Sequence, residues 1–434
     1  MKLTRGAQRR GGNGVFFWRV GKAVRDASDQ GSRCAVSSAA VTLCVLALWS
    51  APASSQDIND LNIDFHTGPI INSGRVVGLG GAYTSVSEGA DGHLINPASF
   101  AVRYMYDADD DFSYDFSLSS INDFGSDTNE LDLSGRASYD EATFDQIGLN
   151  MKWLKFGGGI HLFGQSYSIQ VPNSDGTVSV YDYSQEFAVL GFAYNFRGGD
   201  VVLGMSLTTG TAELSERGAQ SLKMVGGGGM FGALWAPASA NFRLGGTFRS
   251  RTRLFQRNAE DFEGEEVTNV GRLRAPASVI IPWEAALGWS YMFGPRDYNF
   301  KPTFGLWIKR GELKPERKGP RRYLLVSADL VVTGPADNGI GVQSFLAQND
   351  LEQSGQHATV SPRAGVESEF WEDVMVARVG TYYEPSRFEP LAGRIHGTAG
   401  LDVHISLWLE WKLGITVDVA ENYVNTGFGL GFWH

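Results

Sequence analysis

Regular alternation of apolar and polar residues is the dominant pattern in this chain of 434 residues. The segment LDVHISLWLEW at 401–411 places six apolar residues on one face of a strand and four polar residues on the other. IPWEAALGWSYMF at 281–293 alternates in the same way, with tryptophan and tyrosine near its ends. Alternation over about ten residues is typical of a strand with one face in lipid, although the strands of a soluble β-sandwich alternate too.

Segments of this kind recur along the whole chain and are separated by turn residues. We expect 14 strands, beginning near residues 103, 144, 156, 184, 200, 224, 241, 279, 322, 362, 374, 397, 413 and 422. An even number returns both chain ends to the periplasmic side, as single-chain bacterial barrels require. The fold class expected is therefore all-β: a transmembrane antiparallel β-barrel spanning residues 101–434.

The connections between these segments alternate between long and short. The long ones, expected outside the cell, lie near 120–143, 171–183, 211–223, 254–278, 334–361 and 384–396. One long connection, 294–321, falls on the periplasmic side and ends in a basic cluster of Lys309, Arg310, Lys314, Arg317, Lys318, Arg321 and Arg322. This insert is either a docking surface for a periplasmic partner or a solvated loop. If FKPTFGLWIK within it were a strand, the count would rise toward sixteen.

Residues 1–53 have the three parts of a secretory signal peptide. A positively charged region precedes the apolar run AVSSAAVTLCVLALWSAPA, which ends in Ala51-Pro52-Ala53. The run is too short to span a membrane comfortably. We expect Sec-type export with cleavage after Ala53, or alternatively near Ser55 and Gln56.

Removing this leader changes what chemistry the chain offers. Both cysteines, Cys34 and Cys44, are lost, so the mature chain has no thiol. Because the leader holds eight Lys/Arg and two Asp, the net charge moves from −11 to −17. So acidic a protein is not expected to bind nucleic acid.

The C-terminal sequence ENYVNTGFGLGFWH also favours a barrel. Asn425, Gly427, Leu430 and Phe432 form a pattern that resembles the terminal signal read by the outer-membrane barrel assembly machinery. The chain departs from that pattern by adding Trp433 and His434 after the usual final aromatic residue. The expected location is the outer membrane of a Gram-negative cell, in contact with lipid and lipopolysaccharide.

The stretch GLGGAYTSVSEGADGHLINPASF at 78–100 is rich in glycine but does not fit a phosphate-binding loop, because it contains no lysine. The lumen of a 14-strand barrel is too wide for ordinary side chains to fill. Residues 54–100 have too few alternating apolar residues to add a strand, so we expect them to fold back as a hatch that plugs the lumen. Asn96-Pro97 would fix the exit into the first strand.

This stretch resembles the N-terminal hatch signature of the FadL-like long-chain fatty-acid outer-membrane transporters. The matching positions are Gly78, Gly80, Ala82, Tyr83, Asp91, Asn96, Pro97 and Ala98, while Ser99 stands where many relatives have glycine. Two later stretches, APASVIIPWEAALGWSYMF and VMVARVGTYYEPSRFEP, are also similar to the family. The resemblance implies that Gly78, Gly80, Asp91, Asn96, Pro97 and Ala98 belong to a gating hatch.

The resemblance further implies passive uptake of a hydrophobic compound, of the fatty-acid or aromatic type, with lateral release through the barrel wall. No ligand-contacting residue can be carried over. Related PorV-like barrels start with a similar sequence, so a structural or secretion-associated barrel that binds protein partners is the alternative.

Enzymatic function is not expected from these residues. Asp402, His404 and Ser406 share one face of a strand, but side chains two apart rarely form a catalytic relay. The histidines show no metal-ligand spacing, so we expect no metal and no cofactor.

Overall fold

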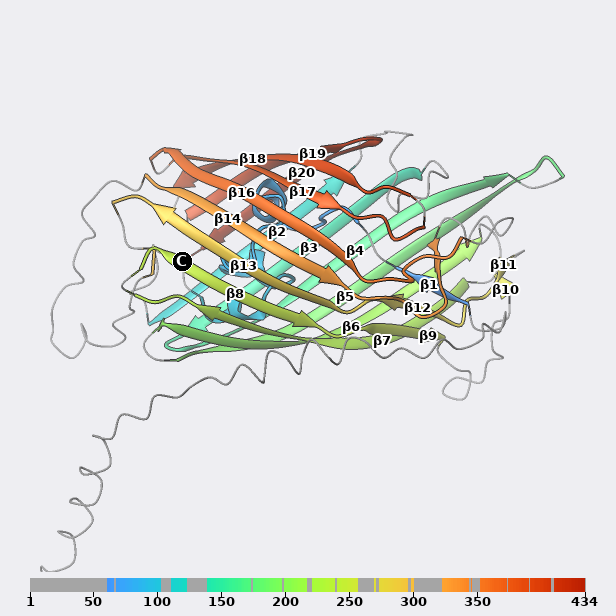
Figure 1. Ribbon diagram of the computed structural model, residues 1–434, viewed down its shortest axis with the longest axis horizontal. Coiled ribbons are helices and arrows are strands. Elements are labelled where there is room, and N and C mark those ends of the chain that lie inside the picture. Colours follow the sequence, from blue (N-terminus) through green and yellow to red (C-terminus); the bar gives the residue numbers. More distant parts are fainter. Residues whose placement is uncertain are drawn as a thin grey trace, which may run out of the picture. The chain divides into compact units, whose positions relative to one another are not determined.

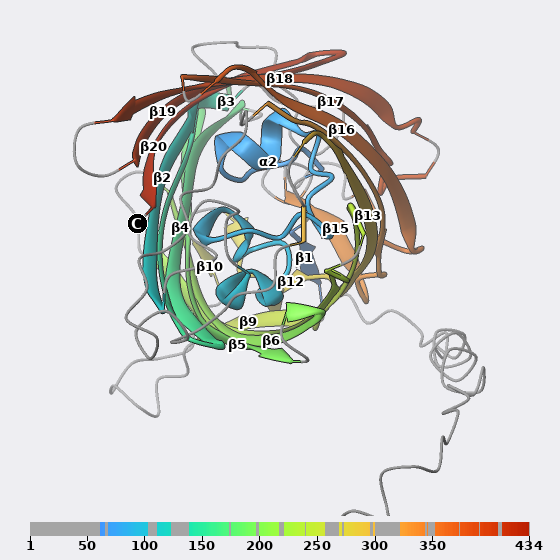
Figure 2. The same cartoon turned by 90° about the vertical axis from the view of Figure 1, so that its left-hand side faces the viewer.

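The computed structural model describes residues 61–433 except 66–67, 103–110, 123–138, 173–174, 197–198, 217–220, 239, 257–268, 271–272, 296–297, 300–321, 343–344, 346–351, 373, 390 and 407–409. Within these residues, 14 antiparallel strands form a closed β-barrel (Figures 1 and 2). The barrel closes where its first strand pairs with its last, in a register that places Phe116 opposite Phe432.

The barrel strands are β2 (Phe112–Asn122), β3 (Tyr139–Trp153), β4 (Phe156–Pro172), β5 (Val178–Phe196), β6 (Val201–Glu216), β7 (Ser221–Trp235), β8 (Phe242–Arg249), β13 (Glu284–Phe293), β14 (Leu324–Thr333), β16 (Thr359–Trp371), β17 (Met375–Glu384), β18 (Arg394–Ser406), β19 (Glu410–Ala420) and β20 (Tyr423–Trp433). Short strands lie at the end opposite the C-terminus: β9 (Thr252–Gln256), β10 (Asn269–Val270), β11 (Leu273–Arg274), β12 (Ser278–Ile281) and β15 (Gly339–Gly341) (Figure 1). We call this the loop end.

The expected strand number is confirmed, and most strands begin within a few residues of the expected position. The first strand is the exception, since β2 begins at Phe112 rather than near residue 103. The segment FKPTFGLWIK and the basic cluster from Lys309 to Arg321 lie outside the described residues.

The outer face of the barrel is apolar. Leu190, Leu207 and Leu287, on three different strands, are 64%, 63% and 71% exposed. Aromatic pairs gather at the C-terminal end, such as Trp411 and Phe432 with ring centroids 4.8 Å apart. An apolar band with an aromatic girdle is the surface that a bilayer covers. Among the described residues, no helix is long and apolar enough to cross a membrane.

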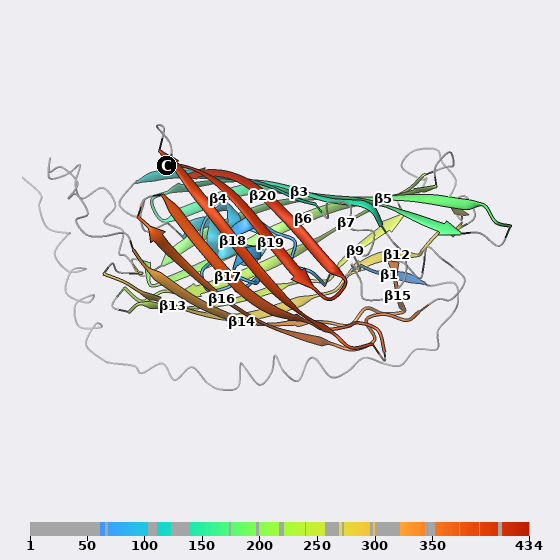
Figure 3. The same cartoon turned by 90° about the horizontal axis from the view of Figure 1, so that it is seen from above.

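The wall of the barrel is uneven in height. Strand β5 has 19 residues and β4 has 17, whereas β13, β14 and β17 have 10 each. In Figure 3, β5 accordingly reaches far toward the loop end. The wall therefore extends further toward the loop end on the side of β4 and β5 than on the side of β13, β14 and β17.

Residues 61–65 and 68–102 lie inside the ring of strands (Figure 2), and we call them the inner segment. The inner segment holds β1 (Asn62–Asp64), helix α2 (Gly74–Gly78) and the 3₁₀ turns η2 (Ala90–Gly92) and η3 (Pro97–Ala101). Helix α2 packs on β17, β18, β19 and β20, and η3 packs on β4, β5, β6 and β7. The segment therefore bridges opposite sides of the lumen.

The inner segment adds no strand to the 14-strand barrel, and its short strand β1 pairs in parallel with β12 and β15 at the loop end. One expectation about the wall is wrong. Ile281 does not belong to the outer face of the strand that follows it, since Pro282 and Trp283 separate β12 from β13. Ile281 lines an internal cavity instead.

Candidate lumenal site

Glycines allow the backbone of the inner segment to touch the wall directly. Gly80 follows α2 with φ of +59°, a conformation that a residue with a side chain rarely adopts. A Cβ atom on Gly80 would collide with the backbone of Thr381, and one on Gly380 would collide with the amide nitrogen of Gly80. Gly78 ends α2, and its carbonyl accepts a hydrogen bond from the Thr398 hydroxyl at 3.3 Å.

Asn96, Pro97 and Ala98 form the start of η3. The Asn96 side chain accepts a hydrogen bond from the Ala98 amide at 3.0 Å, and Pro97 occupies the first position of the turn, where no amide donor is needed. The Asn96 amide group donates to the carbonyl of Thr84 at 2.8 Å and to that of Ala233 on β7 at 3.2 Å. Asn96 thus ties the turn both to its own segment and to the wall.

Asp91 connects the middle of the inner segment to two strands. Its carboxylate lies 2.7 Å from the Lys412 ammonium on β19 and accepts a hydrogen bond from Ser117 on β2 at 2.6 Å. Burial by itself would raise the pKa of Asp91, but the Lys412 charge and the two hydrogen bonds outweigh it and hold this pKa well below its usual range.

A buried network of charges crosses the lumen through the inner segment. Arg75 on α2 donates Nε and Nη2 to the two carboxylate oxygens of Glu367 on β16, both at 2.8 Å. Glu367 also accepts from Arg378 on β17 at 2.5 Å, and Arg378 pairs with Asp402 on β18 at 2.8 Å. On its other side, Arg75 pairs with Glu88 at 2.9 Å.

Glu88 continues this network to the opposite wall. It pairs with Arg243 on β8 at 2.8 Å, and Arg243 also donates to the carbonyl of Val86 at 2.9 Å. Sequence reasoning missed these charged residues. Their signal was available: Arg243, Glu367, Arg378 and Asp402 occupy lumen-facing positions in strands whose other face is apolar.

A second ion pair holds the inner segment at the loop end. Arg387 donates to both carboxylate oxygens of Asp64, at 2.7 and 3.1 Å, and the Ser354 hydroxyl donates to Asp64 at 2.7 Å. Asp64 lies in β1, so a single buried carboxylate joins the inner segment to two of the long connections.

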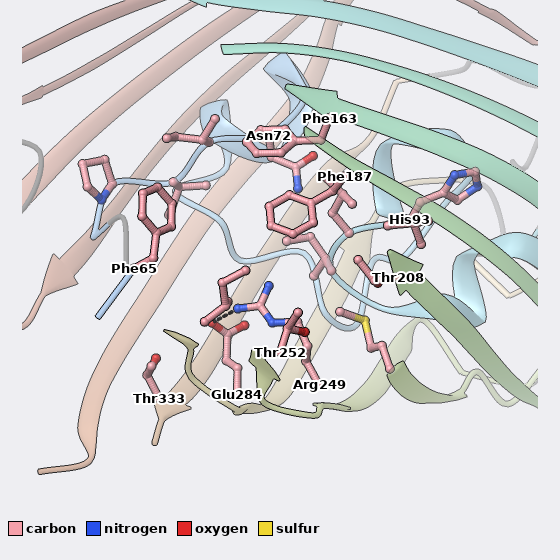
Figure 4. Close-up of a pocket in the computed structure, with 18 of the residues that line it drawn as sticks. Phe65, Asn72, His93, Phe163, Phe187, Thr208, Arg249, Thr252, Glu284 and Thr333 are labelled. Carbon is pink, nitrogen blue, oxygen red and sulfur yellow. Dashed lines mark hydrogen bonds and ion pairs between the residues drawn. The ribbon is translucent and has the colours of Figure 1, made fainter. Parts of the chain in front are cut away.

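A cavity of about 200 Å³ lies between the inner segment and the wall (Figure 4). Its lining is largely apolar and comes from both sides: Phe65, Ile70, Ile71, Leu94, Ile95, Phe163, Phe187, Val189, Met230 and Ile281. The rings of Phe163 and Phe187 stack with centroids 6.3 Å apart. Such a space favours an apolar molecule, because entering it removes apolar surface from water.

The same cavity carries a small number of polar groups. Arg249 and Glu284 form an ion pair of 3.1 Å, drawn as a dashed line in Figure 4. Arg363 also lines the cavity, and its Nε donates to the Ser361 hydroxyl at 3.4 Å. Within the described residues, Arg363 makes no ion pair.

A recess of about 590 Å³ lies on the outer face of strands β2–β7, lined among others by the exposed residues Leu118, Leu162 and Val225. Phe163 and Phe187 line both this recess and the internal cavity. The ladder between β4 and β5 runs past them without a break. The cavity and the recess on the outer face thus share these two residues of the wall.

The four C-terminal signal positions lie on the last strand, β20. Asn425 and Gly427 face inward, and Leu430 and Phe432 face outward, as alternation predicts. Phe432 stacks on Phe116 of β2 with ring centroids 5.5 Å apart, so it covers the seam where the barrel closes.

No model of a known protein family matches the sequence, and no curated protein matches it. Solved structures do resemble it. A Pseudomonas aeruginosa FadL homologue has a TM-score of 0.50 at 12% identity, over 84% of this chain and 97% of that one. The CymD monoaromatic hydrocarbon channel has a TM-score of 0.51 at 10% identity, over 85% and 98%. The chain has the FadL-type barrel fold. A TodX ΔS2S3 mutant, also a monoaromatic hydrocarbon channel, matches with a TM-score of 0.50 at 12% identity, over 84% and 97%.

Within this FadL-type barrel, the six predicted hatch positions do not form one cluster. Gly78 and Gly80 lie against β16–β18, Asp91 against β2 and β19, and Asn96 to Ala98 against β5–β7. They are points at which the inner segment is attached around the lumen. The cavity residues were not among the predicted positions.

Proposed function

We propose that this chain is an outer-membrane channel for the passive uptake of hydrophobic small molecules and performs no catalytic step. The observation that carries the proposal is the largely apolar cavity between the inner segment and the wall. The FadL-type fold supports it, since structural neighbours with this fold include a monoaromatic hydrocarbon channel. Export by the leader at 1–53, assembly through the β20 signal and contact with lipopolysaccharide belong to the same proposal.

The inner segment is the gate in this proposal. It fills the lumen and is held to the wall by buried ion pairs, including those of Asp64, Arg75 and Asp91. Within the described residues the lumen therefore offers no water-filled passage, and a solute must leave its hydration water behind to enter. For an apolar molecule, entry lowers the free energy by about 25 cal/mol per Å² of apolar surface buried. For an ion, entry is unfavourable because its hydration is lost.

Release is proposed to occur sideways, at Phe163 and Phe187. Both rings line the internal cavity and the recess on the outer face, so moving them would connect the two spaces. A solute leaving there enters lipid without crossing water. The unbroken ladder between β4 and β5 means that these strands must separate locally for release.

Uptake of labelled toluene and labelled oleate tests the proposal, using cells that lack their own transporter and express this chain. Heat-modifiable gel migration would establish that the barrel is folded in the same samples. Uptake of either compound above that of cells with an empty vector supports the channel. A folded barrel that takes up neither compound contradicts it and favours the alternative, a secretion-associated barrel, which pull-down from crosslinked membranes would then test.

A further inference from the structure

We propose that the preferred ligand of the internal cavity is a single-ring aromatic carboxylate rather than a long-chain fatty acid or a neutral hydrocarbon. The inference rests on the proposed function and specifies the substrate class of the same cavity. Three features carry it: the volume of the cavity, the aromatic side chains on its wall, and the charge of its polar groups.

Volume limits the ligand to about one ring. The cavity measures about 200 Å³. An engineered apolar cavity of about 150 Å³ in another protein binds benzene. The present cavity therefore has room for one ring with a small substituent, whereas an extended chain of eighteen carbons would need the inner segment to move.

The walls suit a flat ring. Phe65 comes from the inner segment, and Phe163 and Phe187 come from β4 and β5, so aromatic side chains from both sides reach the cavity (Figure 4). Aromatic pairs gain about 0.5–1.5 kcal/mol beyond simple burial when they stack with an offset or meet edge to face. A ring between these residues gains that contribution, which a flexible chain does not.

The polar groups favour a negative charge. Arg249 and Glu284 neutralise each other through their ion pair, which leaves Arg363 as the excess positive charge among the lining residues. Within the part of the chain that the structure describes, the Arg363 guanidinium has a neutral hydroxyl, that of Ser361, as its hydrogen-bond partner. A guanidinium presents parallel N–H donors that match the two oxygens of a carboxylate.

This local charge contrasts with the protein as a whole, whose net charge is −11. The overall charge of the protein therefore does not explain why a positive side chain lines an apolar cavity. Asp329 lies directly opposite Arg363 in the β14–β16 ladder and interacts with it electrostatically, but the two form no ion pair among the described residues. The Arg363 guanidinium therefore still has N–H donors for a ligand carboxylate, and the ring attached to that carboxylate would fill the apolar part.

The test measures binding of benzoate, benzamide and toluene to the folded full-length mature barrel in detergent, by calorimetry at neutral pH. Benzamide has the shape of benzoate without the charge. We expect benzoate to bind at least about tenfold more tightly than benzamide, since a hydrogen bond to a charged group contributes roughly 1.5–3 kcal/mol. Arg363→Gln should remove this preference and leave toluene binding unchanged, while Arg363→Lys should retain part of it.

Lys223→Gln is the matched control, because it removes one positive charge from an exposed outward-facing pair with Glu213. It should leave all three affinities unchanged. Equal binding of benzoate and benzamide to the unmodified protein overturns the inference, and this result does not depend on whether Arg363→Gln folds. An equal loss of benzoate and toluene binding in a folded Arg363→Gln overturns it too. If toluene binds and is taken up without any benzoate preference, the inference fails and the proposed function stands. If none of the compounds binds or crosses, the proposed function itself fails.

Discussion

Arg75 of helix α2 and Glu367 of β16 are joined by two parallel hydrogen bonds of 2.8 Å across 292 positions of sequence. Glu367 is fully buried and is shared with Arg378, so one carboxylate compensates two guanidinium groups. Glu367 is therefore a point at which the seating of the inner segment depends on the wall. The neighbouring pairs cannot replace it, because Glu88 lies on the far side of Arg75 and already pairs with Arg243.

Replacing Glu367 should therefore loosen the inner segment without unfolding the barrel. In Glu367→Gln the two arginines lose their shared counter-charge, and breaking a buried pair in this way costs about 3–5 kcal/mol. We expect frequent large openings in single-channel recordings, where the unmodified protein stays nearly closed. Glu213→Gln, on the exposed pair with Lys223, should record like the unmodified protein. If Glu367→Gln shows no more openings than the unmodified protein, the buried charge network does not hold the inner segment in place.

Gly80→Ala should have a related but smaller effect. The left-handed backbone of Gly80 costs a residue with a side chain about 1–2 kcal/mol, and the added Cβ would also press on the backbone of Thr381. We expect faster hydrogen–deuterium exchange across residues 74–102 while exchange in the barrel strands is unchanged. Gly397→Ala is the matched control, because a Cβ at Gly397 meets open space. Equal exchange in the two variants would contradict a close contact at Gly80.

Mild acid should weaken the seating of the inner segment through His93. Burial, and next the nearby His161, hold the pKa of His93 well below the ordinary histidine value of about 6.5, so the packed state keeps the ring neutral. When the inner segment leaves the wall, the exposed His93 binds a proton below about pH 6.5. In the packed state His93 binds a proton only at a lower pH, because its pKa is lower there. Stability of the packed state therefore falls as the pH drops from 6.5.

The measurement is exchange of residues 74–102 at pH 7.5 and pH 5, corrected for the intrinsic pH dependence of exchange. His93→Phe should flatten the response, because a phenyl ring can keep the stacking on Phe100, whose centroid lies 4.0 Å from that of His93. Asp91 should not contribute in this range. Its pKa is lowered by Lys412, so its stabilisation is fully present above about pH 3.9 and is lost only in stronger acid. A response that persists in His93→Phe would assign the effect to another group.

The sequence predicted the wall of this protein better than its interior. Leu287 on the outer face and Asn425 on the inner face follow directly from alternation, because lipid and lumen impose opposite polarity on successive residues. The break at Pro282 was visible as a proline, yet its consequence for Ile281 was not, since parity is lost wherever a strand stops. The ends of strands were accordingly the least predictable part of the barrel.

Partners inside the lumen could not be predicted from the chain. The glycine-rich stretch indicated close packing, but nothing in it shows that Gly80 meets Gly380, because that contact depends on how α2 is rotated against the wall. Arg75 and Glu367 are likewise brought together by barrel closure and not by any local spacing. Inward-facing charges on strands with an apolar outer face were the available clue that the lumen contains polar partners.

A disulfide between β4 and β5 should block release at Phe163 and Phe187. Gly164 and Glu186 lie directly opposite each other on these strands and line the outer recess, so a cysteine pair there can bridge within the reach of a disulfide. The expected mature chain has no other cysteine. We expect Gly164→Cys with Glu186→Cys to reduce toluene uptake several-fold when the pair is oxidised, and uptake to recover on reduction.

The control is Leu287→Cys with Leu330→Cys, an opposed outward pair of β13 and β14, and its toluene uptake should be insensitive to oxidation. Uptake that is equally unaffected in both pairs would remove β4 and β5 as the exit, whereas equal loss in both would show that the whole barrel, and not this seam, must deform.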